Sequence, residues 1–144
     1  MLFRSEADIP CVQLSLIEGL DPAEHLALGA ALQGVEWEEL LVIGSGFSFH
    51  NMQAFFGAST AETRRMNHAF EDWLLETILS EILSNAERQS RLLAWDKAPH
   101  ATYCHPRCEH LLPLHVCMGL TQRACSKAYS LEILGQQSSM FLWS

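Results

Sequence analysis

The feature that most constrains the fold of this chain is an apolar run, Leu-Leu-Val-Ile at residues 40–43, which is followed by Gly44, Ser45 and Gly46 and then by His50. Aliphatic residues that end at turn-forming glycines predict a strand buried on both faces of a sheet. His50 would then lie just beyond the carboxyl end of that strand. Because ligands bind at this edge of open α/β sheets, His50 is a candidate functional residue.

A second apolar segment at residues 9–17 predicts an earlier strand, and a helix is expected between the two strands. Asp21 and Pro22 predict the start of this helix, because an N-cap oxygen and a first-turn proline both suit a helix amino terminus. The helix is expected to run to Gly34. A strand, a helix and a strand in this order favour parallel pairing. We therefore expect an α/β fold, a partial three-layer sandwich in which a mostly parallel or mixed sheet is flanked by helices.

The second half of the chain carries further helix and strand signals. A long amphipathic helix is expected to begin at Ser59. Residues 96–108 predict a loop, because their two prolines interrupt a helix. Residues 128–134 and 139–143 predict two closing strands on either side of Gly135.

Composition limits the classes of function. The chain has 144 residues, enough for one core, so a single domain over residues 1–144 is expected. Its formal net charge of -8 argues against nucleic acid or an anionic membrane as partner.

No apolar run approaches the roughly 18 residues that a membrane span needs, and the start of the chain lacks the layout of a secretory signal. The five cysteines are an odd number without framework spacing. Reduced thiols and a cytoplasmic location are therefore expected.

Two histidines stand at the ends of expected elements. His50 is followed by Asn51, and His110 follows Glu109 at the start of an expected helix over residues 109–120. A neutral imidazole binds a metal through one nitrogen while a neighbouring polar group orients the other. Two histidines are too few for a catalytic metal site, which normally has three protein ligands. From spacing alone, a shared metal site and two structural histidines bonded to the backbone both stay open.

Other motifs in the same regions carry weaker signals. Cys104, His105, Cys108 and His110 place four zinc-type donors in one short loop, although no second ligand pair follows at finger or ribbon spacing. The glycines around Ser45 match neither phosphate-loop template nor the nucleophile elbow of hydrolases.

Four blocks of the sequence resemble one known family. The blocks are residues 9–16, 44–51, 105–114 and 138–141, and they resemble the DOPA-dioxygenase type of the class III extradiol ring-cleaving dioxygenases, in the family's order and spacing. The resemblance covers the carboxyl-terminal portion of that family's catalytic domain.

The resemblance implies a non-haem metal centre holding Fe(II) or Zn(II). In the family's pattern His110 corresponds to a metal ligand, and His50 corresponds to a catalytic acid–base group that also belongs to the metal site. His105 and Asn51 would border the substrate. The family's two other ligand motifs, a His-Gly-Ser-Pro loop and a His-Trp pair, do not occur in this sequence, so the site is expected to be incomplete.

Two functions follow from this resemblance. The first is extradiol cleavage of a DOPA-like catechol by dioxygen, impaired in this chain by the lack of the amino-terminal ligands. The second is a non-catalytic, truncated homologue that binds metal or acts as an interaction module. In either case we expect self-association through apolar surface that the rest of the family's domain would cover.

Overall fold

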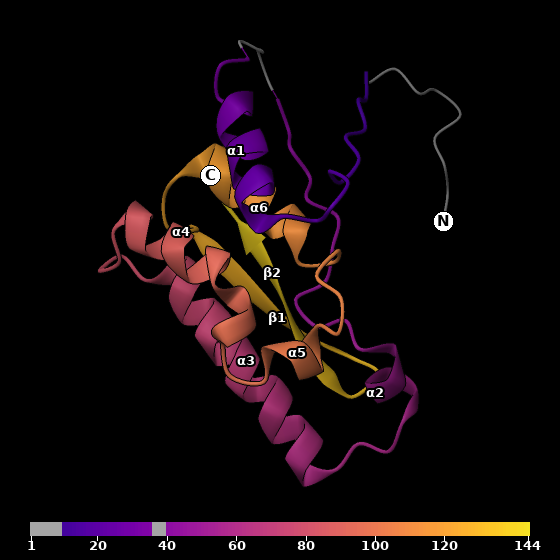
Figure 1. Cartoon of the computed structure of the whole chain (residues 1–144). Helices are drawn as coiled ribbons and strands as arrows, with labels where there is room; N and C mark the ends of the chain where they lie inside the picture. The colour runs from indigo at the N-terminus through magenta and orange to yellow at the C-terminus, as the bar shows by residue number, and fades with distance from the viewer. Residues whose placement is uncertain (1–9, 36–39) are drawn as a thin grey trace.

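The computed structural model of the chain describes residues 10–35 and 40–144. Its elements, in chain order, are α1 (Pro22–Leu32), α2 (Met52–Phe56), α3 (Ala61–Leu79), α4 (Asn85–Leu93), the 3-10 turn η1 (Trp95–Lys97), α5 (Ala101–Cys104), α6 (Leu112–Thr121), β1 (Lys127–Ile133) and β2 (Gln136–Leu142). Figure 1 shows that α3 runs along the hairpin of β1 and β2, whereas α1 and α6 lie together at the opposite end from α2. None of the described helices is both long and apolar enough to cross a membrane.

The first helix begins where the sequence predicts. The Asp21 side chain accepts a hydrogen bond from the Ala23 backbone N–H at 2.7 Å, and Pro22 occupies the first turn. The helix ends at Leu32, two residues before Gly34. Its capping follows from local chemistry, because a carboxylate satisfies one of the backbone N–H groups that a helix start leaves without a partner.

Helix α1 packs directly on α6 at two glycines. A Cβ atom added to Gly29 would lie 2.0 Å from the Val116 carbonyl oxygen, and one added to Gly119 would lie 2.0 Å from the Leu26 carbonyl oxygen. The two helix backbones therefore approach more closely than any side chain would permit.

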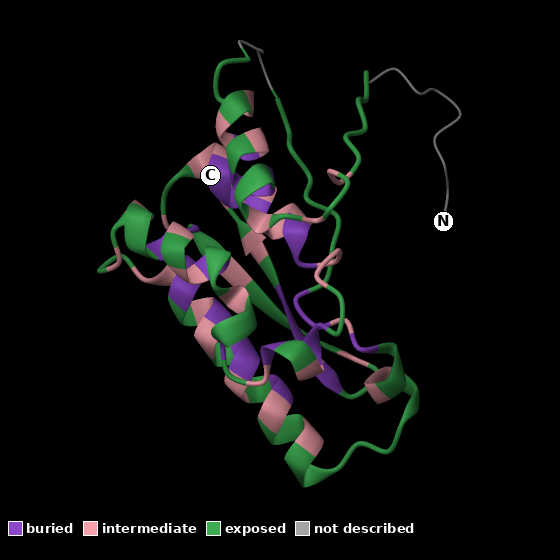
Figure 2. Ribbon diagram, viewed as in Figure 1, coloured by how far each residue is buried: buried purple, intermediate pink, exposed green. Residues whose placement is uncertain are grey.

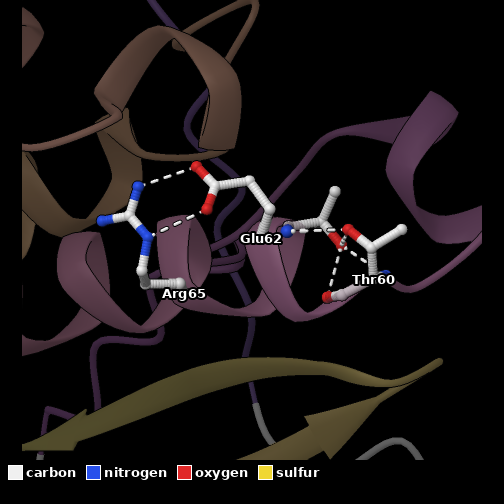
Figure 3. A network of polar contacts seen from close by, with 4 residues as sticks. Thr60, Glu62 and Arg65 are labelled. Atoms are coloured by element: carbon white, nitrogen blue, oxygen red, sulfur yellow. Dashed lines mark hydrogen bonds and ion pairs between the residues drawn. The ribbon is translucent and has the colours of Figure 1, made fainter.

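Helix α3 begins at Ala61, two residues after the start predicted at Ser59. Thr60 is the N-cap, and its side chain and that of Thr63 each accept a hydrogen bond from the other's backbone N–H. Glu62 instead pairs with Arg65, at 2.7 and 3.0 Å for its two oxygens, as Figure 3 shows. Threonine can replace serine as a cap because both carry a hydroxyl at Cβ.

The end of α3 is held by a buried arginine from α4. The Arg88 guanidinium donates to the carbonyl oxygens of Thr77, Ser80 and Leu83, the last two at 2.9 and 3.1 Å. One planar side chain thus satisfies carbonyl groups that a helix carboxyl end leaves without partners.

The core lies between α3, α4, α5, α6 and the hairpin, and in Figure 2 the buried positions of α3 recur along one face of the helix. Phe70, Leu74 and Ile78 on that face are completely buried. This spacing of three and four residues is the helical period expected from the sequence.

The sheet of the described residues is one antiparallel pair. Strands β1 and β2 pair from Lys127 opposite Leu142 to Ile133 opposite Gln136. Leu134 and Gly135 form the turn with φ of 51° and 76°, the left-handed values that a tight two-residue hairpin needs. The two closing strands predicted around Gly135 are therefore confirmed.

The outer edge of β2, on the side away from β1, is covered by side chains. The Asn67 amide of α3 donates to the Gln137 carbonyl oxygen at 2.9 Å and accepts from the Gln137 N–H at 2.7 Å. Asn67 thus pairs with one residue of β2 as a neighbouring strand would.

The prediction of a mostly parallel, three-layer sheet is not confirmed. Residues 10–17 and 40–43 contain no strand, and Ile9, the first residue of the earlier predicted strand, lies outside the described residues. Leu41 and Ile43 are each 77% exposed, so the prediction of a buried strand at residues 40–43 is wrong for this chain. A strand exists only when a neighbouring strand completes its hydrogen bonds, and the described residues place no strand beside either segment.

The close contact of α1 with α6 predicts the cost of one added methyl group. Gly119→Ala should lower the free energy of unfolding by about 2 kcal/mol or more, because its Cβ meets a backbone carbonyl that cannot rotate away. Gly34→Ala is the control, since its Cβ would lie 3.6 Å from the Ala31 oxygen, an ordinary contact. Urea denaturation of the three proteins measures the difference. Equal stability of the two variants would contradict this account of the helix contact.

Candidate functional site

The segment that carries His50 is attached to the loop before α6 by two backbone hydrogen bonds. The Phe47 N–H donates to the His110 carbonyl oxygen, and the His50 N–H donates to the Cys104 carbonyl oxygen, both at 3.0 Å. Gly46 is necessary for this approach, because a Cβ atom there would lie 2.2 Å from the His110 carbonyl oxygen. The need for glycine at position 46 is therefore explained by the close approach of its backbone to His110, and not by a turn at the end of a strand.

The two histidines singled out in the sequence meet face to face. The ring centroids of His50 and His110 lie 3.5 Å apart with the planes 20° from parallel. Phe47 lies beside both rings, with centroid distances of 6.3 and 6.4 Å, and Phe55 meets His50 edge-on at 6.4 Å. Residues 60 positions apart in the chain are therefore brought to one place, with aromatic rings around them.

The protonation of His50 is set by its surroundings. Burial lowers its pKa below 6.5, and the neighbouring His110 ring lowers it further, while Glu109 opposes both. Two stacked imidazoles cannot easily carry a charge each, so the neutral ring that a metal or a proton acceptor requires is favoured. Glu109 itself binds the Arg107 Nε at 2.8 Å.

Both polar atoms of the Asn51 side chain form hydrogen bonds within the protein. Its Oδ1 caps α2 by accepting from the Ala54 N–H at 3.0 Å, and its Nδ2 donates to the Tyr103 carbonyl oxygen at 2.7 Å. Both ends of the amide thus fix the loop next to His50. A contact of Asn51 with substrate stays a prediction.

His105 lies behind the stacked pair and is 1% exposed. Its Nε2 lies 2.6 Å from the Ser48 carbonyl oxygen, and since a carbonyl only accepts, this nitrogen carries the hydrogen. Burial lowers the pKa of His105 to about 4, so the ring is neutral at physiological pH. The structure gives His105 a role in holding residue 48, and its contact with substrate stays a prediction.

The cysteines of the short loop proposed as an alternative zinc site, Cys104 and Cys108, are directed at different parts of the protein. The Cys104 thiol is directed at the Met66 carbonyl oxygen and the Cys108 thiol at that of Leu20. Burial raises the pKa of the Cys104 thiol to about 12, so the metal-binding thiolate is disfavoured. Within residues 10–35 and 40–144, no group of three His, Cys, Asp or Glu side chains could hold a metal ion. The described chain therefore supplies a pair of imidazoles rather than a complete metal site.

Sequence reasoning missed a buried carboxyl behind this pair. Glu71 of α3 is 0% exposed, and its Oε2 accepts from the Ser139 hydroxyl at 2.6 Å. Burial raises the pKa of Glu71 to about 7, while the hydroxyls of Ser139 and Ser48 lower it in part. The signal was available in the sequence, because Glu71 falls on the apolar face of the helix, between Phe70 and Leu74.

Comparison with curated proteins finds relatives that are named dioxygenases. The chain is 33% identical to dioxygenase tasH of Hapsidospora irregularis over 152 residues, which include 99% of this chain and 46% of the relative. It is 39% identical to the 4,5-DOPA dioxygenase extradiol of Beta vulgaris over 119 residues, 83% of this chain and 42% of the relative. A protein of the same name from Portulaca grandiflora is 36% identical over 79% of this chain. No family model matches the sequence.

These relatives are oxygen-using enzymes by name, and the chain spans less than half of their length. The chain belongs to the family of the 4,5-DOPA extradiol dioxygenases, as its sequence blocks indicated.

The raised pKa of Glu71 predicts a pH-dependent contribution to stability. Between pH 4.5 and about 7 the folded protein keeps a proton on Glu71 that the unfolded chain has released, so stability falls as pH rises through this window. The full effect is about 3 kcal/mol. His105 acts in the opposite direction between about pH 4 and 6.5, because its pKa is lowered.

Glu71→Gln separates the contribution of Glu71 from that of His105, because the substitution removes the titration of residue 71 and leaves that of His105. The unfolding free energy of Glu71→Gln minus that of the wild type should increase from pH 5 to pH 8, measured by urea denaturation. A difference that does not vary with pH would contradict the raised pKa.

Proposed function

We propose that this chain forms part of an extradiol dioxygenase that opens a catechol-type ring next to its two hydroxyl groups. The observation that carries the proposal is the His50–His110 pair, 3.5 Å apart and attached by backbone hydrogen bonds, in a chain related to enzymes of that name. Both atoms of dioxygen would enter the ring-opened product, so the reaction needs no further reductant. A DOPA-like catechol is the substrate that the relatives' names suggest.

The donor set fits a metal centre in part. His110 would be a metal ligand, and His50 would lie at the metal, with Fe(II) or Zn(II) as the ion because imidazole suits both. A bound ion would hold the catecholate and lower the pKa of its hydroxyl group. The remaining ligands would come from outside the described residues, which do not complete a group of three.

His50 would carry the proton transfers. Its lowered pKa favours the neutral ring, which accepts a proton from a catechol hydroxyl and can return it to the product. Phe47 and Phe55 would limit water at this ring, because both flank it. A cytoplasmic setting is part of the proposal, supported by the free thiols of Cys104, Cys108, Cys117 and Cys125.

A second candidate is a non-catalytic module that binds metal weakly or binds other polypeptides. The observation that favours it is the exposure of Leu41 and Ile43 in a segment of strand-like sequence. Such a chain would self-associate or pair with a partner through this segment.

Oligomeric state tests the second candidate. The purified chain should form a species larger than a monomer. The double variant Leu41→Lys, Ile43→Lys should be monomeric, because charge on an apolar interface opposes association. Analytical ultracentrifugation measures this. A monomeric wild type at about 100 μM would count against self-association.

Metal content and oxygen uptake test the first candidate. The chain alone should be nearly inactive with L-DOPA, and activity should appear when it is co-expressed with the part of a relative that it does not cover. His50→Ala should then lower turnover at least about 100-fold with metal retained, because a general acid–base group is lost. His110→Ala should lose both metal and turnover.

His68→Ala is the matched control for both variants, since it removes an exposed histidine of α3 away from the pair. Iron and zinc are measured by elemental analysis, and ring cleavage by absorbance and oxygen consumption. Turnover that survives in His50→Ala would exclude the role assigned to His50.

A further inference from the structure

The carboxyl group of Glu71 is connected to the histidine pair by a short series of contacts. Its Oε2 accepts from the Ser139 hydroxyl at 2.6 Å, and the Ser139 backbone N–H donates to the Ser48 hydroxyl oxygen at 2.7 Å. The Ser48 carbonyl oxygen in turn accepts from His105 Nε2 at 2.6 Å. We call Glu71, Ser139, Ser48 and His105 the Ser48 anchor.

The Ser48 anchor joins elements that are distant in the sequence. Glu71 comes from α3, Ser139 from β2 and His105 from the end of α5, and all of them converge on residue 48. Ser48 is itself buried, so its hydroxyl and carbonyl have to find partners within the protein. Both groups do so through the anchor, which restrains residue 48 from the side of the sheet and from the side of α5.

Residue 48 stands two positions before His50, within a segment whose ends are already restrained. The Phe47 and His50 N–H groups donate to the carbonyl oxygens of His110 and Cys104. Those bonds fix the segment toward α5 and α6 only. Within the anchor, Ser139 and Glu71 add the restraint toward the hairpin and α3.

Glu71 is otherwise an unfavourable residue for its location. Its Oε1 is buried without a hydrogen-bond partner among the described residues, and no ion pair to it is formed within them. A leucine at this position of the helix would pack without that cost. What the carboxyl gains in return is its interaction with the hydroxyls of Ser139 and Ser48, of which the hydrogen bond from Ser139 is 2.6 Å long.

We propose that Glu71 is a positioning residue, which fixes Ser48 through Ser139 and so holds the His50 ring against His110. The consequence for ring cleavage rests on the function proposed above, whereas the positioning itself does not. Asp72 on α3 and Cys104 of α5 are the titratable groups that interact with the carboxyl, and Ser139 of β2 contributes a hydroxyl. An ionised carboxylate accepts more strongly than a neutral acid, so the anchor tightens as Glu71 loses its proton.

The test compares two substitutions of the same residue in the purified chain. Glu71→Leu removes the acceptor, and Glu71→Gln keeps an oxygen that Ser139 can bind. Amide hydrogen exchange at Ser139 and His50 should increase about tenfold in Glu71→Leu and stay within about twofold of wild type in Glu71→Gln, as expected for loss of one buried hydrogen bond. The nuclear Overhauser cross-peak between the His50 and His110 ring protons should weaken in Glu71→Leu alone.

Gln137 serves as the internal reference, because its N–H is held by Asn67 rather than by the anchor. Glu81→Gln, which changes an exposed carboxylate beyond α3, is the matched control variant. An equal increase in exchange at Gln137, Ser139 and His50 would mean a general loss of stability and would overturn the proposal. Unchanged exchange at His50 with an unchanged ring cross-peak would also overturn it.

Ser139→Ala provides a second, milder variant if Glu71→Leu does not fold. It removes the hydroxyl that reaches Glu71 but keeps the N–H that reaches Ser48, and it should reproduce the local increase at His50. These measurements use no substrate and no metal. If they succeed while the co-expressed protein cleaves no catechol, the positioning role stands and the proposed function fails.

Discussion

Two backbone hydrogen bonds determine whether this protein has a site at all. They join the segment of Phe47 and His50 to the carbonyl oxygens of His110 and Cys104, both at 3.0 Å. Gly46 permits the contact because nothing larger fits against the His110 carbonyl oxygen. The ring stacking, the lowered pKa of His50 and the cap on α2 all depend on this placement of the backbone.

The region behind the histidine pair is buried, and it is nearly uncharged between about pH 4 and about pH 7. His105 is neutral there because burial lowers its pKa to about 4, and Glu71 retains its proton up to a pKa of about 7. The same cause, desolvation, moves an acid and a base in opposite directions and leaves both uncharged. The charge that His50 experiences therefore comes chiefly from His110 and Glu109, at the side where a ligand would bind.

Local chemistry made parts of the fold predictable from the sequence. The Asp21 cap, the apolar face of α3 and the hairpin around Gly135 depend on a few neighbouring residues, and each forms as expected. The strands predicted at residues 9–17 and 40–43 depend on another backbone, which the sequence pattern cannot supply. Spacing alone left the pairing of His50 with His110 open, and only the resemblance to a family favoured it. Glu71 was missed because helical periodicity identifies the apolar residues of a face and does not report an acidic residue that lies among them.

The side chains along β2 have a consequence for how this hairpin can grow. Asn67 and Ser48 accept the outward N–H groups of Gln137 and Ser139, so a new chain cannot form ladder bonds there without displacing them. The residues of β1 are mostly exposed and have no such covering among the described residues. The sheet can therefore be extended at one edge only. An added strand could pair with β1 beside Ala128 and Ser130, whereas the outer edge of β2 is closed by Asn67 and Ser48.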